Sequence, residues 1–258
     1  MRAVILAAGR GSRMGPLGDD RPKCLVELHG HALLEYQVAA LRAAGVSEIG
    51  VVRGYRAERI DRPDLAYFHN ELWAQTNMVL SLATAATWLS AGPVVVSYAD
   101  IFYRSAVVQS LAAAPGQLVI SYDRQWRRLW SRRFADPLAD AETFRVDGDG
   151  RLREIGGKTT RIEDIQGQYM GLLKFTPGAW QSVEAVLSTL DEATRNRLDM
   201  TGLLRRLLAA DFPIQTVASD NQWGEIDNPE DATLYEEMIG SGELVLEDLR
   251  QPKKVTAK

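Results

Sequence analysis

Short apolar runs of strand length alternate with longer amphipathic segments in the N-terminal part of the chain. We expect strands at 4–8, 49–52, 65–68 and 94–98, with helices between them at 32–44 and 77–90. In 32–44 the apolar side chains recur at helical spacing, and Gly45 follows, a residue type that commonly ends helices. Strands that alternate with helices predict an α/β fold with a mostly parallel central sheet and helices on both faces.

The pattern changes after residue 117. A strand at 118–120 is followed by a stretch rich in Arg, Trp and Asp over 124–142, and an Asp-Gly-Asp-Gly sequence at 147–150 predicts a hairpin turn. Further strands are expected at 169–175, 216–218 and 223–226, and helices at 178–190, 199–210 and 229–238. We expect a single domain over residues 1–239, with 124–160 as a small inserted arm and 240–258 as a polar, flexible tail.

Composition narrows the class of protein. The 258 residues carry a net charge of −4, and the one basic run is Lys253-Lys254, which argues against a nucleic-acid partner. The single cysteine, Cys24, excludes an internal disulfide and fits a reducing compartment. Neither a signal peptide nor an apolar run of membrane-spanning length is visible, so we expect a cytoplasmic protein without a membrane partner.

The first strand leads into a loop of small residues, Ala-Ala-Gly-Arg-Gly-Ser-Arg at 7–13. Gly9 and Gly11 lack the Cβ atoms that would keep backbone N–H groups away from a polyphosphate. Arg13 and Lys23 supply positive charge close by in the sequence. A nucleoside triphosphate is the expected ligand, and the alternative is a plain strand-to-loop turn in which the glycines serve backbone geometry alone.

Two other phosphate-binding loops fit less well. The dinucleotide fingerprint G-x-G-x-x-G fails because Gly15 comes one residue late, and the second strand ends at Arg53-Gly54 without an acidic residue for a ribose. The sequence G-x-x-x-x-G-K-[ST] is absent. A nicotinamide-dependent oxidoreductase is therefore a distant alternative.

Enzymes that transfer phosphoryl or nucleotidyl groups from a triphosphate need a divalent metal to neutralise its charge, and acidic residues at strand ends could hold such a metal. Asp100 follows the strand at 94–98, and the carboxyl ends of parallel strands meet at one edge of the sheet, so it should lie near the N-terminal loop. Glu225 and Asp227 fall on one face of a late strand. The alternative for Asp100 and Asp227 is a capping or turn role.

Polar and aromatic side chains elsewhere suggest substrate contacts. Gln75, Thr76, Asn77 and Ser81 gather at a loop–helix junction, although Asn77 could simply cap the helix. In the arm, arginines suit a phosphate, tryptophan faces suit a cation, and acids suit an amine. We take Trp126, Trp130, Arg132 and Arg133 as candidates for binding a second, phosphorylated substrate, called the acceptor below. The alternative is that they form a salt-bridged surface used for homodimer contact.

The sequence Leu-Ala-Ala-Gly-Arg-Gly-Ser-Arg-Met at 6–14, followed by Pro16-Leu17 and Pro22-Lys23, resembles the signature of the sugar-phosphate and choline-phosphate nucleotidyltransferases. Gly18 stands where threonine is usual in that family. The resemblance extends to about residue 239 and implies a Rossmann-like, GT-A-like fold. Further segments, such as Gln-Tyr-Met-Gly-Leu at 168–172, look like the small CTP-dependent cytidylyltransferases, among them enzymes that activate phosphorylated amino compounds such as phosphoglutamine in capsule or cell-surface polysaccharide biosynthesis.

The resemblance also implies roles for individual residues. Asp100 and Asp227 would hold Mg²⁺, with Glu225 in support, and Lys158 and Tyr169 would join the acceptor-binding residues. The implied catalytic residues are Arg13, Lys23 and Asp100. The residues expected to contact the nucleotide are Leu6, Ala7, Ala8, Gly9, Gly11, Ser12, Arg13, Lys23, Gln75, Asn77, Ser81 and Ala99.

The expected reaction is Mg²⁺-dependent transfer of a cytidylyl group from CTP to a small phosphorylated acceptor, with release of pyrophosphate. Phosphoglutamine or another amino-phosphate is the expected acceptor. Alternatives are a phosphocholine cytidylyltransferase, a sugar-1-phosphate enzyme that uses UTP or dTTP, and a non-catalytic nucleotide-binding regulator.

Overall fold

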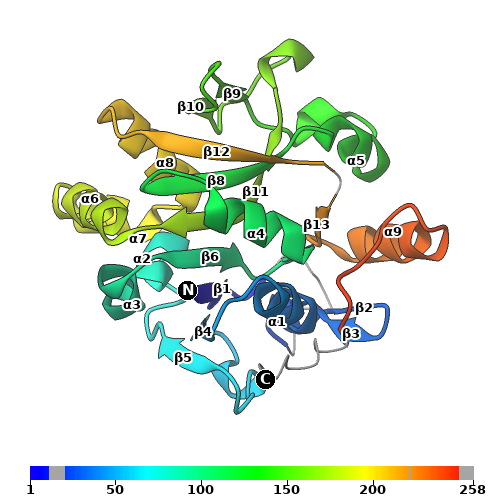
Figure 1. The fold of residues 1–258 in the computed structure, drawn as a ribbon, viewed down its shortest axis with the longest axis horizontal. Helices are drawn as coiled ribbons and strands as arrows, with labels where there is room; N and C mark the ends of the chain where they lie inside the picture. Colours follow the sequence, from blue (N-terminus) through cyan, green and yellow to red (C-terminus); the bar gives the residue numbers. More distant parts are fainter. Residues whose placement is uncertain (12–20, 221, 250–258) are drawn as a thin grey trace, which may run out of the picture.

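The computed structural model describes residues 1–11, 21–220 and 222–249. A seven-stranded sheet forms its centre, with the strand order β12-β8-β11-β6-β1-β4-β5 (Figure 1). The strands are β1 (Arg2–Ala7), β4 (Glu48–Arg53), β5 (Ala66–His69), β6 (Val94–Tyr98), β8 (Leu118–Asp123), β11 (Gln168–Phe175) and β12 (Ile214–Ser219). β11 runs antiparallel to β6 and β8, whereas the other neighbouring strands of this sheet pair in parallel, so the predicted mostly parallel sheet is confirmed.

Helices cover both faces of the sheet because its buried strands present apolar side chains on both sides. Ala3 and Ile5 of β1 pack in one core with α1 (Leu33–Ala43) and α4 (Ser105–Ala113). Val4 and Leu6 point to the opposite core, as alternation along a strand requires. The helices of that second core are α2 (Met78–Ala83), α3 (Ala86–Ala91), α6 (Pro177–Ser188) and α8 (Met200–Ala209).

A small antiparallel pair of strands joins the end of the chain to the centre of the molecule. β7 (Ile101–Tyr103) pairs with β13 (Trp223–Glu225), and Ile101 lies opposite Glu225. The backbone N–H of Ile226 donates to the carbonyl of Asp100 at 3.0 Å. Helix α9 (Pro229–Gly240) then begins with Asn228 as its N-cap. This pairing brings the late acidic segment to the carboxyl end of β6.

The predicted arm contains a helix and a hairpin. α5 (Trp126–Arg133) is followed by β9 (Phe144–Val146) and β10 (Leu152–Ile155), which are joined through the expected turn. The remaining strands and helix of the described residues are β2 (Glu27–Leu28), β3 (His31–Ala32) and α7 (Glu192–Arg197). α5 and α7 are helices that the sequence pattern did not lead us to expect.

The helix expected at 77–90 is two short helices, α2 and α3. The Thr84 hydroxyl donates to the carbonyl of Ser81 at 2.8 Å, and the N–H of Ala85 bonds three residues back to Leu82. Such a side-chain bond to the backbone competes with the regular α-helical pattern and tightens the turn. The result is a break between two helices rather than one long helix.

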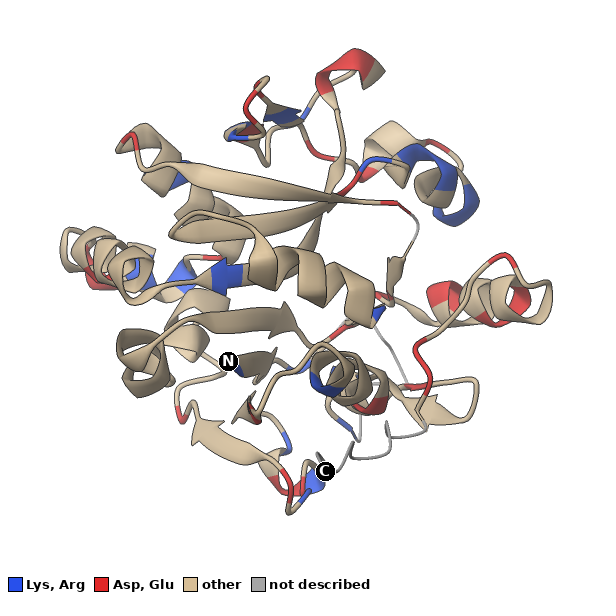
Figure 2. Cartoon of the chain, in the orientation of Figure 1, with Lys and Arg blue, Asp and Glu red and all other residues tan. Residues whose placement is uncertain are grey.

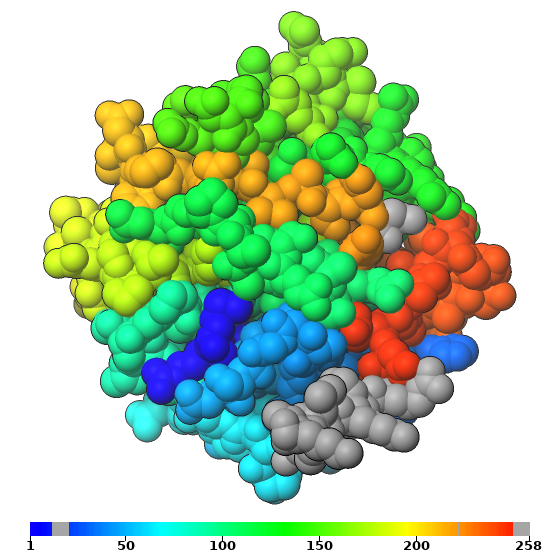
Figure 3. Space-filling view, viewed as in Figure 1, coloured from blue at the N-terminus to red at the C-terminus, as the bar shows by residue number. Residues whose placement is uncertain are grey.

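The segment 241–249 also differs from the expected loose tail. Leu244 is buried in the core beside α1 and α4, and Glu247 accepts the backbone N–H of Ser105 at 2.8 Å at the start of α4. Figure 3 shows this red segment lying against the rest of the molecule. Residues 250–258 of the expected tail lie outside the described residues. Across the described ranges, every helix is too short or too polar to cross a membrane.

Candidate active site

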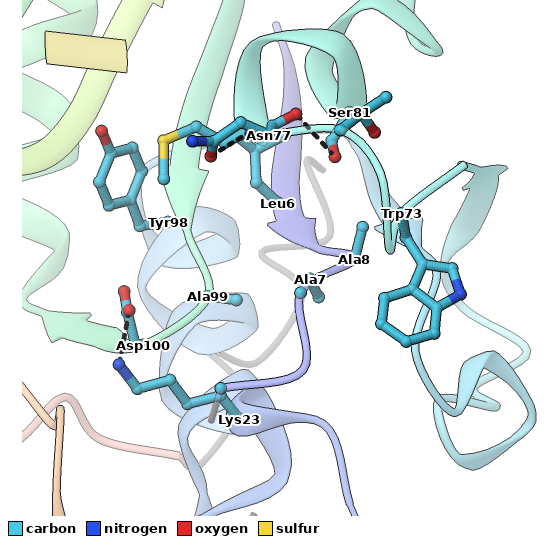
Figure 4. A pocket seen from close by; sticks show the side chains of 14 residues that line it. Leu6, Ala7, Ala8, Lys23, Trp73, Asn77, Ser81, Tyr98, Ala99 and Asp100 are labelled. Atoms are coloured by element: carbon cyan, nitrogen blue, oxygen red, sulfur yellow. Dashed lines mark hydrogen bonds and ion pairs between the residues drawn. The ribbon is translucent and has the colours of Figure 1, made fainter. Parts of the chain in front are cut away.

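The loop after β1 borders a cavity of about 260 Å³ at the carboxyl end of the sheet. It brings together most of the residues expected to contact the nucleotide (Figure 4). These are Leu6, Ala7, Ala8, Gly9, Gly11, Lys23, Asn77, Ser81 and Ala99. Gln75 is exposed and is not part of the lining, and Ser12 and Arg13 lie outside the described residues.

Asn77 and Ser81 reach this cavity from α2, and both also have structural partners. Asn77 Oδ1 accepts the N–H of Met78 at 2.7 Å, so the capping interpretation of Asn77 holds, while its side chain still lines the cavity. Ser81 Oγ accepts a hydrogen bond from Asn70 Nδ2 at 2.9 Å. Trp73 and Tyr98 line the cavity too and were not expected there, because neither stands in a polar motif.

Gly11 has φ of +67°, a backbone conformation that residues with a Cβ rarely adopt. A Cβ at this position would also lie 3.2 Å from the Cβ of Lys23. The glycine therefore allows both the turn of the loop and the close approach of the lysine.

We expect Gly11→Ala to destabilise the fold by about 1 kcal/mol and to weaken nucleotide binding roughly 10- to 100-fold, because the loop and Lys23 must both shift. Gly148→Ala is the matched control, since nothing lies within 4 Å of a Cβ at that position. Denaturant unfolding and CTP titration measure the two effects. Equal CTP affinity in the two variants would show that the loop geometry does not matter for binding.

Lys23 lies between two carboxylates from distant parts of the chain. Its Nζ donates to Asp100 Oδ2 at 2.8 Å and to Asp227 Oδ1 at 2.7 Å, and its side chain is 11% exposed. Burial alone would lower the pKa of Lys23, but the two carboxylates outweigh burial and raise the pKa above its ordinary value. The lysine is therefore positively charged at neutral pH.

Asp100, Glu225 and Asp227 form an acidic cluster in which one oxygen of each lies within 4.8 Å of the others. Within the described part of the chain, Asp100 Oδ1 is buried and has no hydrogen-bond partner. Burial, with Asp227 and Asp100 nearby, raises the pKa of Glu225 well above its ordinary value. Converging carboxylates with an unsatisfied buried oxygen fit a divalent cation with oxygen ligands. Neither aspartate is a helix cap, since Asn228 caps α9 and Arg104 precedes α4.

A second cavity, of about 180 Å³, lies on the other side of the acidic cluster. Glu225 and Asp227 line it, and Tyr98 lines both cavities. The rest of its wall is mainly aromatic and polar and includes Trp130, Asp140, Glu142, Thr143, Phe144, Gln168, Tyr169 and Thr201. The lysine and the carboxylates thus separate a cavity bordered by a phosphate-type loop from one with acidic and aromatic walls.

The expected acceptor-binding residues divide into two groups. Trp130 and Tyr169 line the second cavity. Trp126 does not, because it is buried in the core and its Nε1 donates to the carbonyl of Ile165 at 3.2 Å. Lys158 is exposed, with Nζ 3.1 Å from the carbonyl of Asp140, and is not part of the lining.

The two arginines expected to bind an acceptor phosphate are bound to acids instead. Arg132 Nη1 lies 2.7 Å from Glu243 Oε2 on the surface. Arg133 is buried, with 1% of its side chain exposed, and forms an ion pair with Asp231. Neither arginine lines the second cavity, because carboxylates of α9 and of the segment after it pair with them. Figure 2 shows the basic residues of α5 and the acidic residues of α9. Asp140 and Glu142, acids of the same arm, are the charged residues that the arm contributes to the cavity wall.

Comparison with known proteins identifies the chain as a nucleotidyltransferase. The chain belongs to the family of the MobA-like NTP transferase domain, whose model matches residues 3–162. It is 36% identical over 243 residues to a CTP:phosphoglutamine cytidylyltransferase of Campylobacter jejuni, which covers 88% of this chain and 96% of that protein.

Two solved structures share the fold. The inositol-1-phosphate CTP transferase from T. maritima has a TM-score of 0.72 at 18% identity, covering 93% of this chain and 96% of the other. The CTP:phosphocholine cytidylyltransferase from Streptococcus pneumoniae has a TM-score of 0.67 at 19% identity, covering 92% and 98%. The expected family, fold and enzyme class are confirmed.

Proposed function

We propose that this protein transfers the cytidylyl group of CTP to a small phosphorylated acceptor that carries a positively charged nitrogen, with Mg²⁺ as its metal. The observation that carries the proposal is the position of Lys23, Asp100 and Asp227 between the two cavities. The extensive likeness to a relative named for CTP and phosphoglutamine supports both the nucleotide and the class of acceptor.

The first cavity suits the nucleotide. The backbone at Gly9 and Gly11 can approach a triphosphate, and Lys23 supplies positive charge on the same wall. Trp73, on the far side of the cavity from Lys23 in Figure 4, offers an aromatic surface on which a base can stack.

The proposed reaction is a single displacement at phosphorus. An oxygen of the acceptor phosphate forms a bond to the α-phosphorus of CTP, the bond from that phosphorus to the oxygen bridging the β-phosphorus breaks, and pyrophosphate leaves. The attacking oxygen is already anionic, so no side chain has to remove a proton. Lys23 neutralises charge on the triphosphate, and the remaining catalytic effect comes from positioning the two phosphates.

Asp100, Glu225 and Asp227 would hold the Mg²⁺. When bound, the ion supplies positive charge to the triphosphate and its leaving group. Lys23 contacts both Asp100 and Asp227. The protein therefore holds the lysine ammonium group and these two carboxylates together at the boundary between the two cavities.

The second cavity suits an acceptor with a cationic nitrogen. Asp140 and Glu142 supply carboxylates, and Trp130 and Tyr169 supply aromatic surfaces. Trp130 Nε1 donates to Asp140 Oδ2 at 3.0 Å, which holds this carboxylate in place. An ammonium group bound here would direct the acceptor phosphate toward Lys23.

Phosphocholine is the second candidate acceptor, because the aromatic walls also suit a quaternary ammonium group. A hexose-1-phosphate has no cation to match Asp140 and Glu142, which disfavours the sugar-phosphate enzyme. A protein that only binds a nucleotide would not need both Asp100 and Asp227, the two proposed metal ligands, beside Lys23.

The test is pyrophosphate release with Mg²⁺, crossing CTP, UTP, dTTP and ATP with phosphoglutamine, phosphocholine, 2-aminoethylphosphonate and glucose-1-phosphate. We expect release with CTP and an amino-phosphate. Release with glucose-1-phosphate and UTP or dTTP would establish the sugar-phosphate alternative, and CTP binding without release for any acceptor would establish the regulator.

Glu142→Gln tests the acceptor cavity. We expect the KM for the amino-phosphate to rise roughly 10- to 100-fold with the KM for CTP unchanged, because a charge-assisted hydrogen bond is lost. Glu163→Gln, an exposed glutamate just after the arm, is the control. An unchanged acceptor KM in Glu142→Gln would remove this residue from the acceptor site.

Glu142→Gln should also change how kcat/KM for the acceptor depends on pH. Burial raises the pKa of Glu142 above its ordinary value. Acidification protonates the carboxylate and removes its attraction for an ammonium group, so acceptor kcat/KM should fall at a higher pH than for an exposed glutamate. Glu142→Gln should lack this decrease, and an identical pH profile in both proteins would contradict the assignment.

A further inference from the structure

Arg133 is a cation buried beside the acidic cluster. It lies at the end of α5, and its side chain is 1% exposed. Its Nε and Nη2 donate to Asp231 Oδ1 and Oδ2 at 2.8 and 2.9 Å, a bidentate pair. Nη2 is also 3.4 Å from Asp227 Oδ2, and Nη1 is 3.8 Å from Glu225 Oε2.

Asp231 links this arginine to the backbone of Asp227. The Asp231 side chain is 4% exposed, and its Oδ2 accepts the N–H of Asp227 at 2.8 Å as well as the Arg133 hydrogen bond. The backbone N–H of Asp231 in turn donates to Asn228 Oδ1 at the start of α9. The Arg133–Asp231 pair therefore controls both the main chain and the side chain of Asp227.

The two cations approach opposite oxygens of one carboxylate. Lys23 contacts Oδ1 of Asp227, and Arg133 faces Oδ2. Four carboxylates (Asp100, Glu225, Asp227, Asp231) lie around these two cations. Buried carboxylates at this spacing repel one another, and removal of a buried partner leaves that repulsion uncompensated.

We infer that Arg133 is a positioning residue that orients Asp227 and Glu225 for the metal, and that it is not a ligand of the acceptor phosphate. The inference rests on the proposed metal-dependent function. It also gives the arm a role at the metal, because α5 carries Arg133 while α9 carries Asp231. Groups that orient metal ligands in this way commonly change metal affinity 10- to 100-fold when they are replaced, as a rough range.

The test measures metal binding to the protein itself, with Mn²⁺ as the probe and electron paramagnetic resonance to count free ion in the absence of CTP, which binds Mn²⁺ on its own. We expect Arg133→Met to weaken Mn²⁺ binding roughly 10- to 100-fold, and Arg133→Lys to weaken it less. Arg128→Met is the matched control, because Arg128 lies on the same helix with its side chain 53% exposed and paired to Glu243. Its Mn²⁺ affinity should equal that of the unaltered protein.

The pair variant Arg133→Met with Asp231→Asn guards against loss of folding, since it removes one positive and one negative charge together. In folded variants we expect kcat to fall, the acceptor KM to stay constant, and raised Mg²⁺ to restore part of the rate. Unchanged Mn²⁺ affinity together with a raised acceptor KM would overturn the inference and make Arg133 an acceptor ligand. Absence of Mn²⁺ binding by the unaltered protein would instead contradict the proposed metal dependence itself.

Discussion

Replacement of Lys23 by methionine should lower kcat roughly 10²- to 10³-fold while the protein remains folded, because one preorganised positive charge beside the proposed triphosphate site is lost. The structure adds a second expectation. Lys23 contacts Asp100 and Asp227 at 2.8 and 2.7 Å, so it would compete with the proposed metal ion for the same two carboxylates. Without nucleotide, the variant should therefore bind Mn²⁺ more tightly than the unaltered protein does.

Steady-state pyrophosphate release and Mn²⁺ titration measure these two effects. Arg21→Met is the control, because Arg21 is close in sequence, 48% exposed and 3.7 Å from Glu27. A Lys23→Met variant with normal turnover would contradict the proposed role of the lysine in charge stabilisation.

Asp100→Asn should have an effect of similar or greater size, a loss of roughly 10³-fold in kcat, because it removes a carboxylate proposed to hold the metal. The fold should survive, since Asp100 caps no helix and the change relieves repulsion among Asp100, Glu225 and Asp227. Mn²⁺ affinity should fall together with turnover.

Asp149→Asn, at the exposed hairpin turn, is the matched control and should retain normal turnover and metal binding. Thermal melting of each variant distinguishes a loss of chemistry from a loss of structure. Near-normal turnover of Asp100→Asn at ordinary Mg²⁺ concentrations would exclude Asp100 as a metal ligand.

The part of the site that follows strand ends could be predicted from the sequence. Gly9, Gly11 and Asp100 each follow a buried parallel strand, and the topology of such sheets brings those ends together. Alternation along the late strand made Asp227 a candidate together with Glu225, and its expected role at the metal came from the family resemblance. Its approach to Lys23 depends on the pairing of β7 with β13, a non-local contact that no local pattern specifies.

The arm was harder to interpret, because its charges alone do not show which side chains point inward. Trp126, Leu129, Trp130 and Arg133 recur at helical spacing and form the buried face of α5, whereas Arg128 and Arg132 lie on the exposed face. This periodicity was available in the sequence and places Arg133 with the apolar side chains. Its partner Asp231 lies 98 residues further along the chain, so the pairing of the two residues could not be predicted from a local pattern.

The central claim is cytidylyl transfer to an amino-phosphate, and ³¹P NMR of one reaction mixture tests it most directly. With Mg²⁺, CTP and phosphoglutamine, the proposal predicts that pyrophosphate and a new P–O–P-linked cytidylyl product appear in equal amounts. The proposal is contradicted if CTP remains intact with each amino-phosphate tried, or if the linked product forms only from another nucleoside triphosphate and a sugar phosphate.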